Sequence, residues 1–341
     1  MTAEPRFLVA ASPHLAGRDS TPRIMWSVVG SLVPVVLAAA FFFGPSALLV
    51  LFAATLGALL PEWAMGRRGT LWDGSAAITG LLLGLTLPPG FPMWMAFLGG
   101  VFAIAVGKLV FGGLGQNVFN PALVGRAFLQ AAFPVAITTW NAPSTSGGAS
   151  WWALRGDPFA IPFTTPHMAD TVTSATPLGL MKFEHAGTEW APLLLGNTGG
   201  SLGETSALVI LLCGAYLAAR NYLNWRVPVG VFASVALFSG VLHALDPARF
   251  PGPAFMLLSG GLVLGAVFMA TDMVTSPVTH RGAWVFAAGI GVLVVLIRVW
   301  GGLPEGVMYS ILLMNAMVPF LNRWTQPRVF GSRTRLSEAS S

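Results

Sequence analysis

The sequence predicts an all-α polytopic membrane protein, and its composition and its hydropathy pattern are the two observations that predict it. Hydrophobic residues make up 55% of the 341 residues, charged residues make up 9%, and the mean hydropathy is +0.72. So few charges cannot cover the surface of a water-soluble protein. The hydrophobic residues form runs long enough to enter a bilayer, and such runs become helices because lipid cannot pair their backbone groups.

About ten transmembrane helices are expected, in a first five-helix half (24–137) and a second (206–322). The predicted spans are 24–43, 47–63, 74–87, 92–111, 121–137, 206–222, 227–244, 254–270, 284–299 and 306–322.

The third and eighth spans are expected to be broken helices. Run 74–87 reaches only about 21 Å as a helix, against a hydrocarbon core of about 30 Å. The eighth span runs into the polar stretch 271–277, and residues 80–84 and 261–265 share a Gly-Leu-X-Leu-Gly pattern. Five is an odd number, so the halves would lie in opposite orientations and form inverted repeats around a central site. Chance similarity between glycine-rich helices is the alternative.

Basic residues set the expected orientation, because cytoplasmic loops are enriched in them. With a cytoplasmic N-terminus, all but four of the 18 lysines and arginines fall on or near the cytoplasmic side. Segments 1–23 and 323–341 are then cytoplasmic, and loop 138–205 is extracytoplasmic. The four exceptions are Arg155, Lys182, Arg249 and Arg298.

Cys213 is the only cysteine. A disulfide framework, a zinc site built on several cysteines and a cysteine-ligated iron–sulfur cluster are therefore excluded within this chain. No metal site and no catalytic residue are predicted.

The central loop contains the hydroxyl-rich stretch 170–178, Asp-Thr-Val-Thr-Ser-Ala-Thr-Pro-Leu. Its residue types are typical of a turn before a short helix, with hydroxyls as caps. No histidine or cysteine stands at a spacing that would supply a general base, so the loop is not predicted to be a hydrolase site. A chemical attachment point is the alternative interpretation.

A second informative stretch, 107–126, is rich in glycine and amides. Asn117 and Asn120 supply donors and acceptors at the membrane boundary, which suits hydrogen bonding to a flat heterocycle. Capping of the fifth helix by Asn120 is an equal alternative. The stretch is not a phosphate-binding P-loop, since Leu109 follows Lys108 where that motif requires Ser or Thr.

Four acids stand near helix breaks or membrane boundaries. Asp73 and Asp272 are expected to cap broken helices, and an ion or proton site is the alternative because ionisable groups in membranes usually face a cavity. Glu62 and Glu305 are further candidates.

Five stretches (12–14, 73–80, 107–126, 174–178 and 268–272) carry a resemblance to a known family. The sequence resembles the D subunit of the Rnf ion-translocating electron-transport complex and the related B subunit of the sodium-pumping NADH:quinone oxidoreductase. The short N-terminal segment and the Ala-Thr-Pro-Leu wording at 175–178 favour the first of these two. The B-type subunit is the alternative, and a solute channel or transporter with inverted repeats is a more remote one.

The resemblance implies a covalent flavin: FMN joined through its phosphate to the hydroxyl of Thr176 by a flavin transferase. Ser174 stands where many family members have glycine, and Thr171 and Thr173 are fallback acceptors. The transferase would recognise Asp170, Thr173, Ser174 and Ala175.

The resemblance also implies a non-covalent riboflavin, which we expect near Asn117 and Asn120. The expected partners of the chain are a second FMN-bearing subunit, iron–sulfur subunits, the periplasmic transferase and the lipid bilayer, with no nucleic acid. The complex would sit in the bacterial inner membrane and couple ferredoxin–NAD electron transfer to movement of sodium ions or protons. The isolated chain is not expected to be catalytic.

Overall fold

The computed structural model describes residues 19–66, 70–146, 150–162, 176–184, 187–204, 206–247 and 249–327, and every regular element in these ranges is a helix. The predicted all-α class is therefore confirmed. Within the described ranges, four helices are long and apolar enough to cross a membrane: α1 (Thr21–Phe43), α2 (Pro45–Met65), α10 (Arg226–Leu245) and α13 (His280–Trp300). The count of ten spans and the inverted repeat stay predictions.

Shorter helices complete both halves. The others in the first half are η1 (Thr70–Asp73), α3 (Ser75–Leu85), α4 (Met93–Ile104), η2 (Ala105–Leu109), α5 (Pro121–Ala132) and α6 (Pro134–Thr138). The central loop contains η3 (Ser144–Ser146), α7 (Pro177–Gly179), η4 (Leu180–Glu184), α8 (Trp190–Leu195) and η5 (Leu202–Glu204). The second half adds α9 (Ala207–Ala219), α11 (Pro253–Leu258), α12 (Leu262–Leu264), η6 (Gly265–Met269) and α14 (Val307–Thr325).

Three expected spans are interrupted. Span 74–87 is the short helix α3, as its length suggested. Span 254–270 consists of α11, α12 and the π-helical η6, and it breaks at Gly260, whose positive φ of 65° is open to glycine at little cost. Span 121–137 breaks at Pro134, which has no N–H to continue α5 into α6. The sequence predicted that span 254–270 is broken, but at the polar stretch 271–277 and not at Gly260, and it did not predict the break at Pro134.

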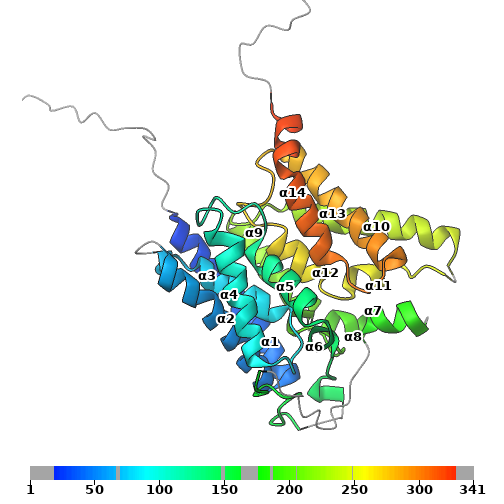
Figure 1. Ribbon diagram of the computed structural model, residues 1–341. Helices are drawn as coiled ribbons and strands as arrows, with labels where there is room; N and C mark the ends of the chain where they lie inside the picture. Colours follow the sequence, from blue (N-terminus) through cyan, green and yellow to red (C-terminus); the bar gives the residue numbers. More distant parts are fainter. Residues whose placement is uncertain are drawn as a thin grey trace, which may run out of the picture.

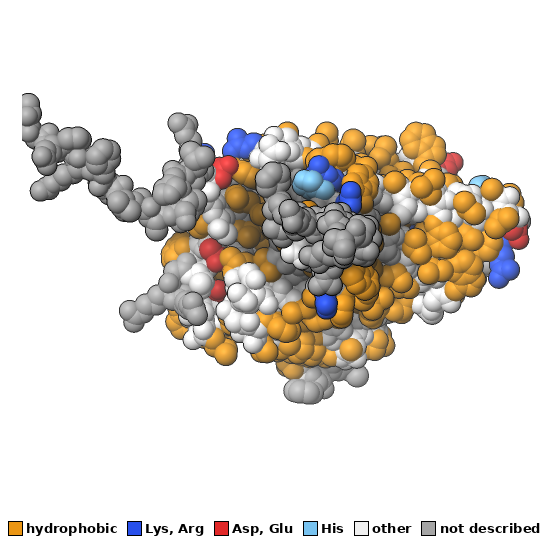
Figure 2. All heavy atoms as spheres, turned by 90° about the horizontal axis from the view of Figure 1, so that it is seen from above, with side chains coloured by type: hydrophobic (Ala, Val, Ile, Leu, Met, Phe, Trp, Pro, Cys, Tyr) orange, Lys and Arg blue, Asp and Glu red, His pale blue; other side chains and the backbone are white. Residues whose placement is uncertain are grey.

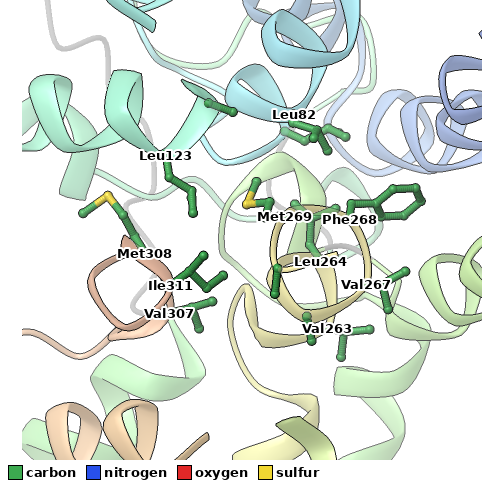
Figure 3. Packing of buried hydrophobic residues seen from close by; sticks show 14 of the residues in the cluster. Leu82, Leu123, Val263, Leu264, Val267, Phe268, Met269, Val307, Met308 and Ile311 are labelled. Atoms are coloured by element: carbon green, nitrogen blue, oxygen red, sulfur yellow. The ribbon is translucent and has the colours of Figure 1, made fainter. Parts of the chain in front are cut away.

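The helices gather in two groups with a seam between them. In Figure 1, α1 to α4 form one group, α10, α11, α13 and α14 form the other, and α5, α9 and α12 lie between. Figure 3 shows the apolar core of the seam, where Leu123 of α5 faces Met308 and Ile311 of α14, with Leu264 and Met269 beside them. The seam therefore joins residues that are far apart in the sequence.

The outer surface is apolar, as expected of a membrane protein. Figure 2 shows hydrophobic side chains covering most of one face, with lysine, arginine and acidic side chains at only a few points. Large side chains on the long helices are exposed, among them Phe52 and Trp63 on α2 and Leu237 on α10. In water, such a contiguous exposed apolar surface would favour aggregation, whereas in a bilayer it is covered by lipid.

We expect Gly57→Val to lower the thermal unfolding midpoint of the detergent-solubilised protein. Helices α2 and α4 touch through glycine: a Cβ at Gly57 would lie 2.1 Å from the Phe97 carbonyl oxygen, and one at Gly100 would lie 2.3 Å from that of Ala54. Small residues at such crossings let backbones pack closely, and overpacking costs about 1–3 kcal/mol. Gly30→Ala on α1 is the control, because its added Cβ meets nothing within 4 Å. Equal midpoints for the two variants would contradict the prediction.

Candidate functional site

Thr176 lies at the beginning of the short helix α7. Its Oγ1 accepts a hydrogen bond from the Gly179 N–H at 3.1 Å, and the residue is 9% exposed. The interpretation of this hydroxyl as a helix cap is therefore confirmed. The other predicted residues of the acceptor pattern lie outside the described residues: Asp170, Thr171, Thr173, Ser174 and Ala175.

Thr176 lines a cleft of about 420 Å³ at the seam between the two halves. Arg126 of α5 reaches the cleft from the first half, and Glu305 reaches it from the loop before α14. Ring systems complete the wall: Trp140, Phe183 and Tyr309. The volume falls in the range of about 300–1,000 Å³ that is usual for ligand pockets. Aromatic rings beside a guanidinium suit a flat ligand that carries an anionic group.

Arg126 connects the two halves through both ends of its guanidinium fork. One terminal nitrogen donates to the Thr86 carbonyl oxygen at the end of α3, and the other donates to Glu305 Oε2 at 2.5 Å. Arg126 is 6% exposed. The positive-residue count placed Arg126 on or near the cytoplasmic side; the structure instead buries it in the cleft that Thr176 lines. Pairing with Glu305 explains its burial, because buried charges in proteins are paired.

A second carboxylate lies next to this pair. Glu305 Oε1 accepts the Gly261 N–H at 3.2 Å, and a Cβ on Gly261 would lie 2.6 Å from Glu305 Oε1 and 3.7 Å from Glu204 Oε1. Both carboxylates therefore lie beside the backbone of Gly261. Arg298 interacts electrostatically with both carboxylates, and its terminal nitrogens donate to the carbonyl oxygens of Met256 and Ser259.

The surroundings raise the pKa of Glu204 to about 7. Desolvation by burial is the main cause, and the Glu305 carboxylate adds to it, whereas Arg126 and hydrogen bonds with Ser201 act in the opposite direction. Part of the Glu204 surface remains accessible. The deep protein surroundings nevertheless decide its pKa, because solvation of a charge extends beyond its contact layer.

Lys182 fixes the segment that follows Thr176 to the second half. Its Nζ donates to the carbonyl oxygens of Arg298 at 3.2 Å, of Gly301, and of Leu303 at 2.9 Å, at and just after the end of α13. Partial burial lowers the pKa of Lys182. A cation is favourable at a helix C-terminus, where carbonyl groups lack intrahelical partners. Thr176 therefore lies six residues before a side chain that is hydrogen-bonded to the end of α13.

A buried ion pair occupies the first half. Lys108 Nζ lies 2.9 Å from Glu62 Oε2 and donates to Ser75 Oγ at 2.7 Å, and both charged side chains are at most 2% exposed. Asp73 completes the group by accepting from the Ser75 N–H and Oγ. Glu62 and Asp73 were candidates from the sequence, but Lys108 was not predicted as their neighbour. The signal was a lysine inside an apolar run, which must find a partner.

Asn117 and Asn120 line one cavity, together with Lys108 and Asp272. Asn120 caps α5 through Oδ1 and donates from Nδ2 to the Met269 carbonyl oxygen at 3.1 Å. The cap alternative is therefore confirmed. Asn117 donates to the Phe119 carbonyl oxygen, while its buried Oδ1 has no partner within the described residues.

Asp73 and Asp272 each accept a hydrogen bond from the backbone N–H two residues ahead, but neither is the expected N-cap, because the N-cap of α3 is Gly74 and that of α13 is Thr279. Asp272 accepts from the Val274 N–H at 3.2 Å and from Thr275 Oγ1 at 3.1 Å, and burial raises its pKa. Within the described part of the chain, no group of three or more His, Cys, Asp or Glu residues is placed to hold a metal ion.

Comparisons with known proteins extend over nearly the whole chain. The family model described as NQR2, RnfD, RnfE matches residues 8–331. The chain is 41% identical to the D subunit of the proton-translocating ferredoxin:NAD(+) oxidoreductase complex of Clostridium ljungdahlii, over 96% of this chain and 97% of that protein. It is 42% identical to the D subunit of the ion-translocating oxidoreductase complex of Stutzerimonas stutzeri, over 93% and 94%.

A third relative is named for a different ion. It is the D subunit of the Na(+)-translocating ferredoxin:NAD(+) oxidoreductase complex of Acetobacterium woodii, 38% identical over 98% of both chains. These identities span both halves and the central loop, as the resemblance of the five motifs implied. The chain is therefore a member of the NQR2, RnfD, RnfE family.

Proposed function

We propose that this chain is the flavin-bearing membrane subunit of a complex that couples electron transfer, of the ferredoxin and NAD type, to ion translocation. The names of its relatives support a place in a multisubunit oxidoreductase. On this proposal, Thr176 carries FMN in a phosphoester bond. The observation that carries the assignment is the position of the Thr176 hydroxyl in a cleft of about 420 Å³ that contains a guanidinium and aromatic rings.

The residues of the cleft fit such a group. Arg126 supplies positive charge for the phosphate, and Trp140, Phe183 and Tyr309 supply faces for a ring system. A bound flavin would supply one- or two-electron chemistry. The protein positions the attachment point, because Lys182 fixes the segment after Thr176 to the end of α13.

Riboflavin stays a prediction with weaker support. The unpaired Asn117 Oδ1 is a suitable acceptor, but the cavity it lines holds only about 100 Å³. That volume is below the roughly 300 Å³ at which ligand pockets usually begin. The cavity therefore fits water-sized ligands as it stands, and no step of the proposed function passes through a flavin there.

The proposal includes an orientation and partners. Both termini would be cytoplasmic and the Thr176 loop periplasmic, in the inner membrane of a bacterium, where a flavin transferase meets the loop. A second FMN-bearing subunit and iron–sulfur subunits would complete the electron path, since Cys213 is the only cysteine of this chain.

The test is covalent flavin on a denaturing gel. Coexpressed with a flavin transferase, the chain is expected to fluoresce under ultraviolet light, and Thr176→Ala is expected to abolish the signal completely. Thr176→Ser keeps a hydroxyl and should keep fluorescence. Thr138→Ala removes another hydroxyl of the same cleft and should also keep it. Fluorescence that persists in Thr176→Ala and disappears in Thr173→Ala or Thr171→Ala would move the acceptor.

A further inference from the structure

Two carboxylates and two guanidinium groups meet beside the Thr176 cleft, and the function proposed above does not use them as a group. They come from four elements: Glu204 from η5, Glu305 from the loop before α14, Arg126 from α5 and Arg298 from α13. We call these four side chains the seam cluster.

Geometry gives the two carboxylates different roles. Glu305 is held by Arg126 at 2.5 Å and by the Gly261 N–H at 3.2 Å, which are strong donors to an ionised carboxylate. Glu204 has the weaker set: the Ser201 N–H at 3.3 Å, and no ion pair within 4.0 Å among the described residues. When the cluster binds a proton, Glu204 is therefore its site.

Unpaired buried atoms of Arg298 and of its hydrogen-bond partner Ser259 leave capacity for solvent. Arg298 is 5% exposed and its Nε has no partner within the described residues; the same holds for Ser259 Oγ, which is 0% exposed. Arg298 interacts electrostatically with both Glu204 and Glu305, and one of its terminal nitrogens would lie 3.3 Å from a Cβ on Gly260. Buried polar atoms without protein partners are the usual positions of ordered water.

We propose that the seam cluster is a proton-binding site: Glu204 takes up and releases one proton, and Glu305 and Arg126 connect its charge to the Thr176 cleft. On uptake, a hydrated proton forms an O–H bond with a Glu204 carboxylate oxygen, and water is the other product. The cluster then changes from no net charge to one positive charge. On release the same bond breaks and the proton returns to water.

Coupling to the cleft follows from charge alone. Arg126 and Glu305 both line the cleft and both act on Glu204 electrostatically. An electron that enters the cleft without a proton adds one negative charge, which favours the protonated form of Glu204. This coupling rests on the flavin assignment to Thr176, whereas the proton site itself does not.

The groups that face Glu204 from each neighbouring element define its pH dependence. Burial is the largest effect and favours the proton, and Glu305 also favours it. Arg126, Arg298 and the hydrogen bonds of Ser201 disfavour it. With a pKa of about 7, Glu204 is protonated below neutral pH and ionised above it. The occupancy therefore changes across the range in which cells work.

Infrared spectroscopy of the assembled complex in detergent tests the site. The carboxylic-acid C=O band of wild type is expected at pH 6, with loss near neutral pH as the solution is titrated to pH 8. Subtracting the Glu204→Gln spectrum should isolate this band. Glu305→Gln removes the neighbouring negative charge and should shift the titration to lower pH. Glu189→Gln, at an exposed acid of the same central loop, is the control and should leave the band unchanged.

The outcomes separate the site from the flavin. A difference spectrum without a titrating band overturns the proton site, even when the gel shows flavin on Thr176. A wild-type band that moves to higher pH on chemical reduction, but does not move in Thr176→Ala, supports the coupling. A band whose titration does not shift on reduction, in a chain that shows flavin fluorescence, overturns the coupling.

A titrating band in a chain without gel fluorescence supports the proton site and contradicts the flavin assignment. Glu204→Asp keeps a titrating carboxyl group and covers the case in which Glu204→Gln fails to assemble.

Discussion

Lys108→Met is expected to destabilise the protein strongly, because it leaves the Glu62 carboxylate buried without its cation. The pair is 2.9 Å apart and both side chains are at most 2% exposed, so neither charge is screened by water. Removing one partner of such a pair costs about 3–5 kcal/mol. The measurement is the thermal unfolding midpoint of the purified chain in detergent.

The double variant Lys108→Met, Glu62→Gln separates the lost pair from the stranded charge. Neutralising both partners removes the unpaired charge, so the double variant should recover most of the midpoint lost by Lys108→Met. Exposed Arg281→Met near the start of α13 is a matched control, with an expected change close to zero. A double variant that is less stable than Lys108→Met would show that Glu62 has another partner to which its charge matters.

Arg126→Met is expected to weaken the contact between the two halves. The change removes donors from the Thr86 carbonyl oxygen and from Glu305 Oε2, and it leaves a carboxylate in the seam. A loss of about 3–5 kcal/mol is expected for the same reason as at Lys108. Limited proteolysis of the central loop and the thermal midpoint are the measurements, and both should report faster or earlier opening.

Arg126→Lys gives a graded comparison. Lysine keeps the charge but lacks the planar fork, so it can hold Glu305 or the Thr86 carbonyl oxygen but not both in the same geometry. Its midpoint should fall between wild type and Arg126→Met. Adding Glu305→Gln to Arg126→Met should recover part of the loss. Equal midpoints for Arg126→Met and wild type would mean that the ion pair contributes nothing to the seam.

The sequence predicted the helices better than the contacts between them. Apolar runs determined the class and most helix boundaries, and the short length of run 74–87 predicted α3 as a broken span. Gly260 gave no comparable signal, because a glycine in an apolar run is common in membrane helices and only its φ of 65° shows the break. Pro134 was visible, but proline is tolerated in membrane helices, so the break there did not follow.

The same distinction holds for the site residues: local contacts could be predicted from the sequence, and contacts between distant residues could not. Thr176 and Asn120 stand in local patterns, and their capping bonds reach only two or three residues ahead, so sequence could predict them. Lys108 and Glu62 are 46 residues apart, and Arg126 and Glu305 are 179 residues apart. Pairs at such separation depend on how helices pack, which no spacing rule describes. The orientation rule counted Lys108 and Arg126 among the charges on or near the cytoplasmic side, and it did not predict that both side chains are buried.

The polar bonds across the seam bear on how this chain can work. Carriers that use alternating access rock one repeat against the other. Here that motion would separate Arg126 from Glu305 and the Asn120 amide from the Met269 carbonyl oxygen, and would leave buried charges and donors without partners. A subunit that carries electrons needs no such motion, because its cofactor can work from a fixed attachment point. The bonds across the seam therefore favour a rigid scaffold for redox chemistry over a transporter that works by rocking its halves.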